Sequence, residues 1–147
     1  MQNVEIKIIN TSENNDPEYA TFGSSGMDLR ANLSAAVTLK PLGRQIIPTG
    51  LFLEIPEGYE IQVRPRSGLA LKHGITCLNS PGTVDSDYRG EIKVILINLS
   101  GETQTIEHGE RIAQMVLCKV EKAFLKPVSE LASSSRGEGG FGHTGKI

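Results

Sequence analysis

Apolar and polar residues alternate along most of this chain, with the period of two that is typical of half-buried β-strands. The clearest case is residues 59–64, where Tyr59, Ile61 and Val63 alternate with polar side chains. Similar apolar runs predict further strands at residues 4–9, 45–47, 51–55, 92–99 and 112–120. No helical period is sustained, and the pattern predicts a single short helix over residues 68–72, with Ser67 as its N-cap.

Turn sequences rich in proline and glycine separate the predicted strands. They lie at residues 41–43, 48–50, 56–58, 79–82, 100–101 and 108–109. Many short strands at nearly regular spacing are typical of a sandwich, a barrel or a jelly roll. We therefore predict an all-β domain over residues 1–130. Residues 131–147 are rich in glycine and have almost no core-forming side chains, so we predict that they form a flexible C-terminal arm.

Size and charge narrow the classes of protein to which the chain can belong. With 147 residues it is expected to form one domain, and its net charge of −2 argues against a surface that coats nucleic acid. No apolar run is long enough to span a membrane, and the N-terminus does not resemble a signal peptide. Cys77 and Cys118 form no C-x-x-C motif, so free thiols are expected, with a disulfide as the alternative. These features predict a cytoplasmic protein that binds neither nucleic acid nor membranes.

The glycines of the last twelve residues fit two phosphate-binding patterns, G-x-G-x-x-G and G-x-x-x-x-G-K. Both patterns need a helix directly after the glycines, and the sequence given ends at Ile147 without one. What remains is a glycine strip that can bend around an anion, with the guanidinium of Arg136 and the ring of Phe141. We therefore predict a lid that closes over a phosphorylated, ring-bearing ligand.

Polar clusters occur where predicted strands end, and each has two interpretations. Asp28, with Gly26 two residues before it and Leu29 directly after it, is either a turn residue that caps its own backbone or a functional acid. Arg66, Ser67 and Gly68 lead into the predicted helix, which suits an oxyanion, although a surface arginine beside an ordinary turn is the alternative. Gln114 interrupts an apolar strand, either at an edge or as an inward polar group with a partner.

The richest segment runs from residue 79 to residue 91. Its Asn79 offers both a donor and an acceptor to a base, and Tyr88 offers a flat surface for a sugar or base. Asp85 and Asp87 share a face if the segment is extended, whereas a turn separates them. The alternative is an acidic β-hairpin loop whose charges are solvated. No single cluster decides between function and plain structure.

Taken together and in order, the clusters resemble the five motifs of the trimeric dUTPase family, the deoxyuridine triphosphate nucleotidohydrolases. The matching segments are Ser25-Gly-Met-Asp-Leu29, Pro65-Arg-Ser-Gly-Leu-Ala70, Gly82-Thr-Val-Asp-Ser-Asp-Tyr-Arg-Gly-Glu91, Gly109-Glu-Arg-Ile-Ala-Gln114 and Arg136-Gly-Glu-Gly-Gly-Phe-Gly-His-Thr-Gly145. Departures are mild: Ser25, Val84 and His143 stand where the family often has Ala, Ile and Ser. None of these positions is expected to perform chemistry.

The resemblance implies a β jelly roll, or distorted β-barrel, that assembles as a homotrimer with active sites between subunits. It implies hydrolysis of dUTP to dUMP and pyrophosphate, with Mg²⁺ bound mainly by the phosphates. This reaction would supply dUMP for thymidylate synthesis and keep uracil out of DNA. The C-terminal arm would close over a site that it shares with neighbouring chains.

The resemblance also implies roles for individual residues. Asp85 would be the general base that directs a water molecule at the α-phosphorus, and Gln114 would help to hold that water. Asp28 would reach the magnesium ion through bound water. The positions that match substrate-binding residues are Arg66, Ser67, Gly68, Asn79, Thr83, Val84, Asp85, Tyr88, Lys93, Arg136, Phe141 and Gly142.

Among these positions, Asn79 and the main chain from Thr83 to Asp85 would pair with the edge of uracil, in a tight hairpin between Asn79 and Lys93. Tyr88 would pack under the deoxyribose and leave no space for a 2′-OH. Arg136 would bind the terminal phosphate, and Phe141 would stack on the base when the arm closes.

Two other functions fit the same fold. A dCTP deaminase would need a differently built base pocket and usually lacks this arm. A non-catalytic nucleotide-binding or regulatory module is also possible, since a fold alone does not determine a function. The presence together of Asp85, Gln114, Arg66 and Arg136 argues against the non-catalytic module.

Overall fold

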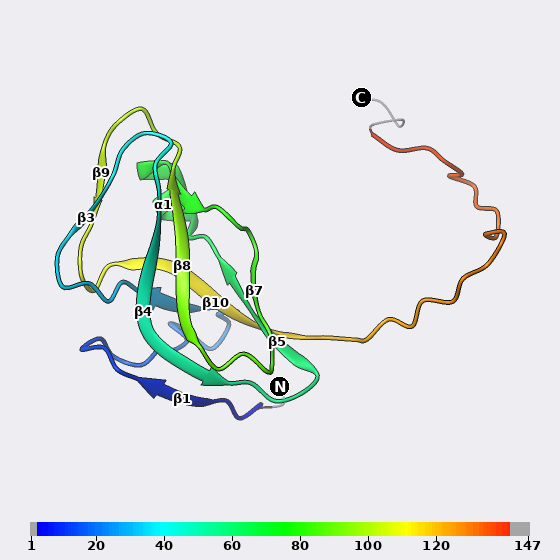
Figure 1. Ribbon diagram of the computed structural model, residues 1–147, viewed down its shortest axis with the longest axis horizontal. Coiled ribbons are helices and arrows are strands. Elements are labelled where there is room, and N and C mark those ends of the chain that lie inside the picture. Colours follow the sequence, from blue (N-terminus) through cyan, green and yellow to red (C-terminus); the bar gives the residue numbers. More distant parts are fainter. Residues whose placement is uncertain (1–2, 142–147) are drawn as a thin grey trace.

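The computed structural model describes residues 3–141, which form ten strands and one short helix (Figure 1). The elements are β1 (Lys7–Asn10), β2 (Met27–Arg30), β3 (Val37–Leu39), β4 (Arg44–Glu54), β5 (Tyr59–Arg64), α1 (Ser67–His73), β6 (Ile75–Cys77), β7 (Gly82–Val84), β8 (Glu91–Asn98), β9 (Gln104–Ile106) and β10 (Arg111–Lys119). The prediction of an all-β fold with one short helix is confirmed.

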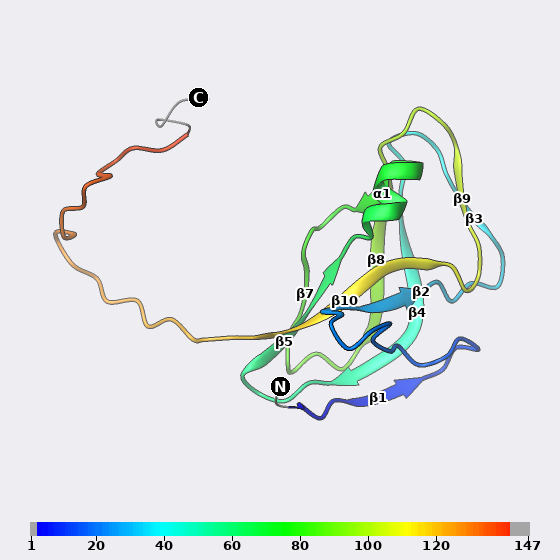
Figure 2. The same cartoon turned by 180° about the vertical axis from the view of Figure 1, so that it is seen from behind.

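Two four-stranded sheets and one two-stranded ribbon make up the body of the molecule. Their strand orders are β1-β4-β8-β6, β2-β10-β5-β7 and β3-β9. Figures 1 and 2 show the long β4–β8 ladder on one side and β10, with β2 and β5, crossing on the other. Buried side chains from both sheets, such as Ile47 and Leu96 from one and Leu29 and Ile61 from the other, form one hydrophobic core. This core holds in place the strand ends that carry the polar clusters.

Strand β4 corrects one prediction about turns. Two strands with a turn at residues 48–50 were expected, but the chain continues as one strand in which the register with β8 shifts between Pro48 and Leu51. This irregularity is a β-bulge. Gly50 has a φ of +75°, and a Cβ on it would lie 2.9 Å from the Cβ of Ser12, so glycine is required here. The glycine therefore marks a bulge in a continuous strand.

The helix begins one residue earlier than predicted. Ser67 is the first residue of α1, and Arg66 occupies the N-cap position in an extended conformation without a side-chain cap. The helix ends at His73, and Gly74 after it adopts the left-handed conformation with a φ of +64°. The Ser67 hydroxyl is therefore not used as a cap and remains available to another partner.

The hairpin predicted for residues 79–93 is wrong as a strand ladder. Strand β7 pairs with β5, whereas β8 pairs with β4 and β6, so the two strands belong to different sheets. Residues 85–90 form the loop that crosses from one sheet to the other. The loop is consequently held from two sides, which matters for the side chains that it carries.

Both cysteines are free thiols, as expected. Cys77 is buried in β6, and burial raises the pKa of its thiol to about 11, so the group stays protonated and packs as an apolar side chain. The one helix of the described residues has only seven residues, and no helix there is long and apolar enough to cross a bilayer.

Beyond β10 the chain leaves the body of the molecule. Residues 121–138 are exposed, and Figures 1 and 2 show this segment running away from both sheets. It carries large apolar side chains, including Phe124 and Leu131, which are about nine-tenths exposed at 91% and 89%. Such side chains have no core to join in their own chain.

Candidate functional site

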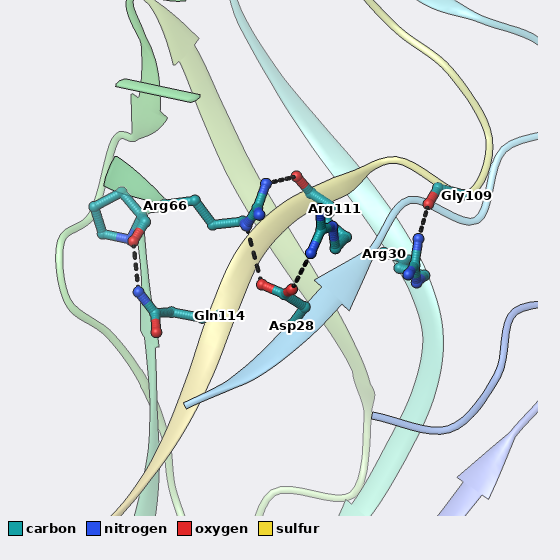
Figure 3. Close-up of polar contacts among 7 residues, drawn as sticks. Asp28, Arg30, Arg66, Gly109, Arg111 and Gln114 are labelled. Atoms are coloured by element: carbon teal, nitrogen blue, oxygen red, sulfur yellow. Dashed lines mark hydrogen bonds and ion pairs between the residues drawn. The ribbon is translucent and has the colours of Figure 1, made fainter. Parts of the chain in front are cut away.

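The first polar cluster surrounds Asp28 (Figure 3). Arg66 Nε donates to Asp28 Oδ1 at 3.0 Å, and Arg111 NH1 donates to Asp28 Oδ2 at 3.1 Å. Arg66 NH1 also donates to the carbonyl oxygen of Arg111 at 3.1 Å. Asp28 lies in strand β2 and its carboxylate binds these arginines, so the turn-cap interpretation is wrong. Two cations around one acid leave a local excess of positive charge, which favours an anionic ligand.

Next to this cluster, Gln114 projects from β10 opposite Asp28 on one side and Arg64 on the other. Its Nε2 donates to the carbonyl oxygen of Pro65 at 3.1 Å, so Gln114 is a polar group with a partner (Figure 3). Its Oε1 accepts no hydrogen bond from residues 3–141. This oxygen lies so close to Gly26 that a Cβ there would collide with it. The amide is thus fixed by its nitrogen, and its oxygen is available to a water molecule.

The start of α1 adds donors to the same region. The amide groups of Ser67 and Gly68 lie in the first helical turn, where N–H groups have no partner within the helix. The first intrahelical bond is from the Ala70 N–H to the Arg66 carbonyl, at 3.0 Å. The Arg66 guanidinium and these amides therefore lie close together in the chain and can bind the oxygens of a phosphate.

The second polar cluster is the loop of residues 85–90. The N–H of Tyr88 donates to the carbonyl oxygen of Asp85 at 3.2 Å, so this segment turns and separates Asp85 from Asp87. The side chain of Arg89 donates to the carbonyl oxygens of Ser86 at 2.7 Å and Tyr88 at 3.0 Å. The loop is thereby stiffened, while the Asp85 carboxylate stays exposed and accepts no hydrogen bond within the described chain.

The remaining predicted binding residues lie beside this loop. Thr83 and Val84 belong to β7, which leads directly into Asp85. Asn79 packs against Gly82, where a Cβ would lie 3.1 Å from the amide Nδ2. On β8, the Lys93 Nζ lies 3.5 Å from Glu91 Oε2. The structure therefore groups these residues around one loop.

The two clusters lie toward opposite ends of β5. On one edge of β5, Gln114 of β10 pairs with Arg64. On the other edge, Val84 of β7 pairs with Ile61, so the next residue, Asp85, lies level with Glu60. Four residues of strand separate these levels, or about 13 Å at roughly 3.3 Å per residue. Two groups that hold one water molecule must each lie within about 3 Å of it. One chain therefore does not bring Asp85 and Gln114 to the same water.

One open pocket lies beside the loop and another beside the Asp28 cluster, and these two pockets have no lining residue in common. A cavity of about 590 Å³ lies beside the loop and is lined by Asp85, Asp87, Arg89 and Tyr59 among others. A second, of about 310 Å³, includes Asp28, Gln114 and Gly26 in its wall. Each pocket holds part of the predicted chemistry, and neither holds all of it.

The arm residues reach neither cluster in this chain. Arg136 Nε donates to the carbonyl oxygen of Gly139 at 2.7 Å, within the arm itself. Phe141 is fully exposed, and Gly142 lies outside the described residues. The predicted lid residues therefore need a surface other than the body of their own chain.

A magnesium ion has a limited set of possible protein ligands here. Within residues 3–141, no group of three or more His, Cys, Asp or Glu side chains could hold a metal ion. Each oxygen of Asp28 accepts one arginine N–H, which leaves a second lone pair for a bound water. Mg²⁺ is usually held by one or two carboxylates, waters and substrate phosphates. These residues fit a phosphate-held ion and do not fit a protein cage.

Sequence reasoning missed two contributors to the site. Arg111 lies in the segment of residues 109–114 that resembles a family motif, but its contact with Asp28 depends on the β2–β10 pairing. Gly26 lies in the motif around Asp28, although its importance lies in the room that it leaves for Gln114. Arg111 and Asp28 are 83 residues apart, so no local pattern could have shown the pairing of their strands or either contact.

Comparison with known proteins places this arrangement in one family. The family profile described as dUTPase matches residues 4–145. A protein of Fusobacterium nucleatum subsp. nucleatum, a deoxyuridine 5′-triphosphate nucleotidohydrolase, is 62% identical over 146 residues, covering 99% of this chain and 100% of that protein.

Solved structures are similar over nearly the whole chain. A mutant dUTPase of Staphylococcus bacteriophage 80alpha, with dUpNHpp, has a TM-score of 0.86 at 26% identity, covering 96% of this chain and 98% of that one. A mutant dUTPase of phage phi11 of S. aureus, described for the coordination of a structural Mg(II) ion, has a TM-score of 0.77 at 24% identity, covering 86% and 98%. The latter likeness concerns the fold alone.

Proposed function

Because the chain belongs to the dUTPase family, with the jelly-roll fold of its relatives, we propose that it hydrolyses dUTP to dUMP and pyrophosphate. The observation that carries this proposal is the family match over residues 4–145, which includes both polar clusters and the arm. In a cell the reaction would supply dUMP for thymidylate synthesis and lower the dUTP available to DNA synthesis. The free thiols support a reducing compartment, and we assign the protein to the cytoplasm.

We further propose that each active site forms between copies of the chain in a homotrimer. The separation of Asp85 from Gln114 along β5 supports this assembly, because their shared water cannot be held by one chain. The loop of one copy would face the Asp28–Arg66–Gln114 cluster of another. The exposed apolar side chains of the segment beyond β10, such as Phe124 and Leu131, support docking of this segment on a neighbouring copy.

In the proposed reaction, Asp85 takes a proton from a water molecule that Gln114 Oε1 also orients. The water oxygen forms a bond to the α-phosphorus, and the bond from that phosphorus to the bridging oxygen breaks. The electron pair leaves with pyrophosphate, whose growing negative charge is stabilised by Arg66 and the amides of Ser67 and Gly68. The local positive charge around Asp28 supports this assignment of the phosphate site.

Magnesium, when bound to the phosphates, would neutralise their charge and fix their orientation. Asp28 would accept a hydrogen bond from a water of the ion, using the lone pairs that its two arginines leave available. Arg66 and Arg111 would keep that carboxylate in one orientation. Lys93 would contribute charge at the loop, although its ammonium already lies beside Glu91.

Specificity for uracil and deoxyribose is assigned to the loop. Asn79 and the main chain from Thr83 to Asp85 would pair with the base, and cytosine would leave buried groups unpaired. Tyr88 would lie under the sugar and exclude a 2′-OH. From the arm, Arg136 would bind the terminal phosphate, Phe141 would stack on the base, and the glycines up to Gly142 would donate N–H groups.

An assay of four nucleotides with Mg²⁺ tests this function. We expect kcat/KM for dUTP to exceed the values for dTTP, UTP and dCTP by about 10²-fold or more, because unpaired buried groups and steric overlap penalise the others. A chain ending at Arg136, assayed in parallel, should lose much of its activity if Phe141 closes the site. Equal rates on all four nucleotides would contradict the pocket, and ammonia release from dCTP would favour a deaminase.

Replacing Gly26 by Ala tests the placement of Gln114. The φ of Gly26 is not in the left-handed region, so the backbone tolerates alanine, but the new Cβ would displace the Gln114 amide. We expect kcat for dUTP to fall about tenfold, with little change in KM, because a misplaced group loses transition-state stabilisation. Gly23→Ala is the matched control, since a Cβ there meets nothing within 4 Å. An unchanged kcat in Gly26→Ala would remove Gln114 from its role.

A further inference from the structure

The loop of residues 85–90 is fastened at its end by Glu91, a residue that the proposed chemistry does not use. Glu91 Oε1 accepts a hydrogen bond from the N–H of Gly50 at 2.9 Å. The carbonyl oxygen of Glu91 accepts a hydrogen bond from the hydroxyl of Tyr88 at 3.0 Å. Glu91 therefore joins the aromatic ring of the loop to strand β4.

The β-bulge in β4 leaves the Gly50 N–H without a partner in the strand ladder, and this N–H binds Glu91. At the bulge, Thr49 is buried and its Oγ1 donates to the carbonyl oxygen of Ile92 at 2.6 Å, while Gly50 turns its N–H toward Glu91. A bulge leaves an extra residue outside the regular ladder. Here the Glu91 carboxylate takes the place of the missing ladder partner. The bulge and the base of the loop thus fix each other.

Gly90 fixes the ring from the other side. A Cβ on Gly90 would lie 2.5 Å from Cζ and 2.9 Å from Cε2 of Tyr88, so the ring lies directly against the Gly90 backbone. The φ of Gly90 is not in the left-handed region, so its backbone does not require glycine. The residue is glycine because of the position of the Tyr88 ring.

We propose that Glu91 and Gly90 are positioning residues that set discrimination between deoxyribose and ribose by fixing Tyr88. The inference rests on the proposed function, in which the Tyr88 ring excludes a 2′-OH. Excluding one oxygen atom requires the ring to be held to within a fraction of an ångström. The hydroxyl bond to the Glu91 carbonyl, the Glu91 anchor on Gly50 and the Gly90 surface supply that constraint together.

The test compares kcat/KM for dUTP and UTP in Glu91→Ala, Glu91→Gln and Gly90→Ala. We expect the dUTP-to-UTP ratio to fall about tenfold or more in Glu91→Ala and Gly90→Ala, since a misplacement of about 1 Å can cost about 10²-fold. Glu91→Gln should keep a ratio close to wild type, because its amide oxygen can still accept from Gly50. Glu102→Ala is the control, as this exposed side chain makes no hydrogen bond or ion pair within residues 3–141.

The outcomes distinguish a role in sugar discrimination from a purely structural role and from failure of the proposed function. If Glu91→Ala does not fold, Gly90→Ala still tests the ring position, because its backbone tolerates alanine. Equal losses on dUTP and UTP, with the ratio unchanged in both variants, would overturn the proposal and leave only a structural role. A wild-type chain that does not hydrolyse dUTP would instead overturn the proposed function.

Discussion

Replacing Asp85 by Asn should lower kcat for dUTP hydrolysis by about 10²–10⁴-fold, the usual contribution of a positioned general base. Nucleotide affinity should change little, because Asn has the same shape and the predicted base contacts come from Asn79 and main-chain groups. The fold should also persist, since the Asp85 carboxylate is exposed and makes no hydrogen bond within the described chain. Turnover by pyrophosphate release and affinity by direct titration of dUTP onto the variant measure the two effects separately.

Asp87→Asn is the matched control for this experiment. Asp87 lies in the same turn, is equally exposed and lines the same cavity as Asp85. Its substitution removes the same charge from the loop, so it reports the general electrostatic effect. We expect its kcat to stay within about threefold of wild type, because Asp87 has no part in the proposed proton transfer and surface substitutions usually change stability by only about 0.5 kcal/mol. Near-normal turnover in Asp85→Asn would remove Asp85 from the role of base.

The sequence predicted the long strands and the fold class well, because their apolar period is strong. The runs at residues 59–64, 92–99 and 112–120 correspond to β5, β8 and β10, with small shifts at their ends. Short strands were missed, among them β3, β6 and β9, each of three residues. Three residues give too few alternations to show a period, and their stability comes from pairing with distant strands.

Proline and glycine residues were the main source of error in the predicted turns. Pro48 and Gly50 predicted a turn, but the chain continues as a strand because the buried Thr49 donates to the Ile92 carbonyl and the residues on either side pair with β8. A proline and a glycine mark either a turn or a bulge, and only the long-range partner decides. Long-range pairing also decides the hairpin that the resemblance implied between residues 79 and 93, because β7 pairs with β5 while β8 pairs with β4 and β6.

The candidate site could be predicted as a set of residues and could not be predicted as a geometry. The motif resemblance pointed to Asp28, Arg66, Asp85 and Gln114 without showing how far apart they lie. The separation along β5 follows from strand register, which no local pattern contains. Gly26 is a further example, because it leaves space for the side chain of Gln114, which comes from a strand distant in the sequence.

Mixing two inactive variants should restore activity if sites form between copies. Arg66→Ala removes a cation from the phosphate cluster and should by itself lower kcat by about 10²–10³-fold, the typical loss for one donor to a developing anion. Asp85→Asn disables the loop instead. In a mixed oligomer, an intact loop from an Arg66→Ala chain can face an intact phosphate cluster from an Asp85→Asn chain. Such a site contains every group that the reaction needs.

Arg30→Ala controls for the loss of a cation from the same sheet. Arg30 lies two residues from Asp28, but its guanidinium donates to the Gly109 carbonyl at 2.7 Å and forms no ion pair with that acid (Figure 3). Oligomers of Asp85→Asn and Arg30→Ala therefore keep every phosphate cluster intact, and their dUTP turnover measures the effect of mixing chains without loss of Arg66.

The most direct measurement is the dUTP turnover of oligomers that contain both Asp85→Asn and Arg66→Ala, isolated through two different affinity tags after co-expression. In a cyclic trimer where each site joins two chains, every trimer that contains both variants has one intact site of three, so activity should reach about one third of wild type. Mixed oligomers that stay as inactive as their parents would contradict the account, because they would show that each chain must supply Asp85 and Arg66 to one site.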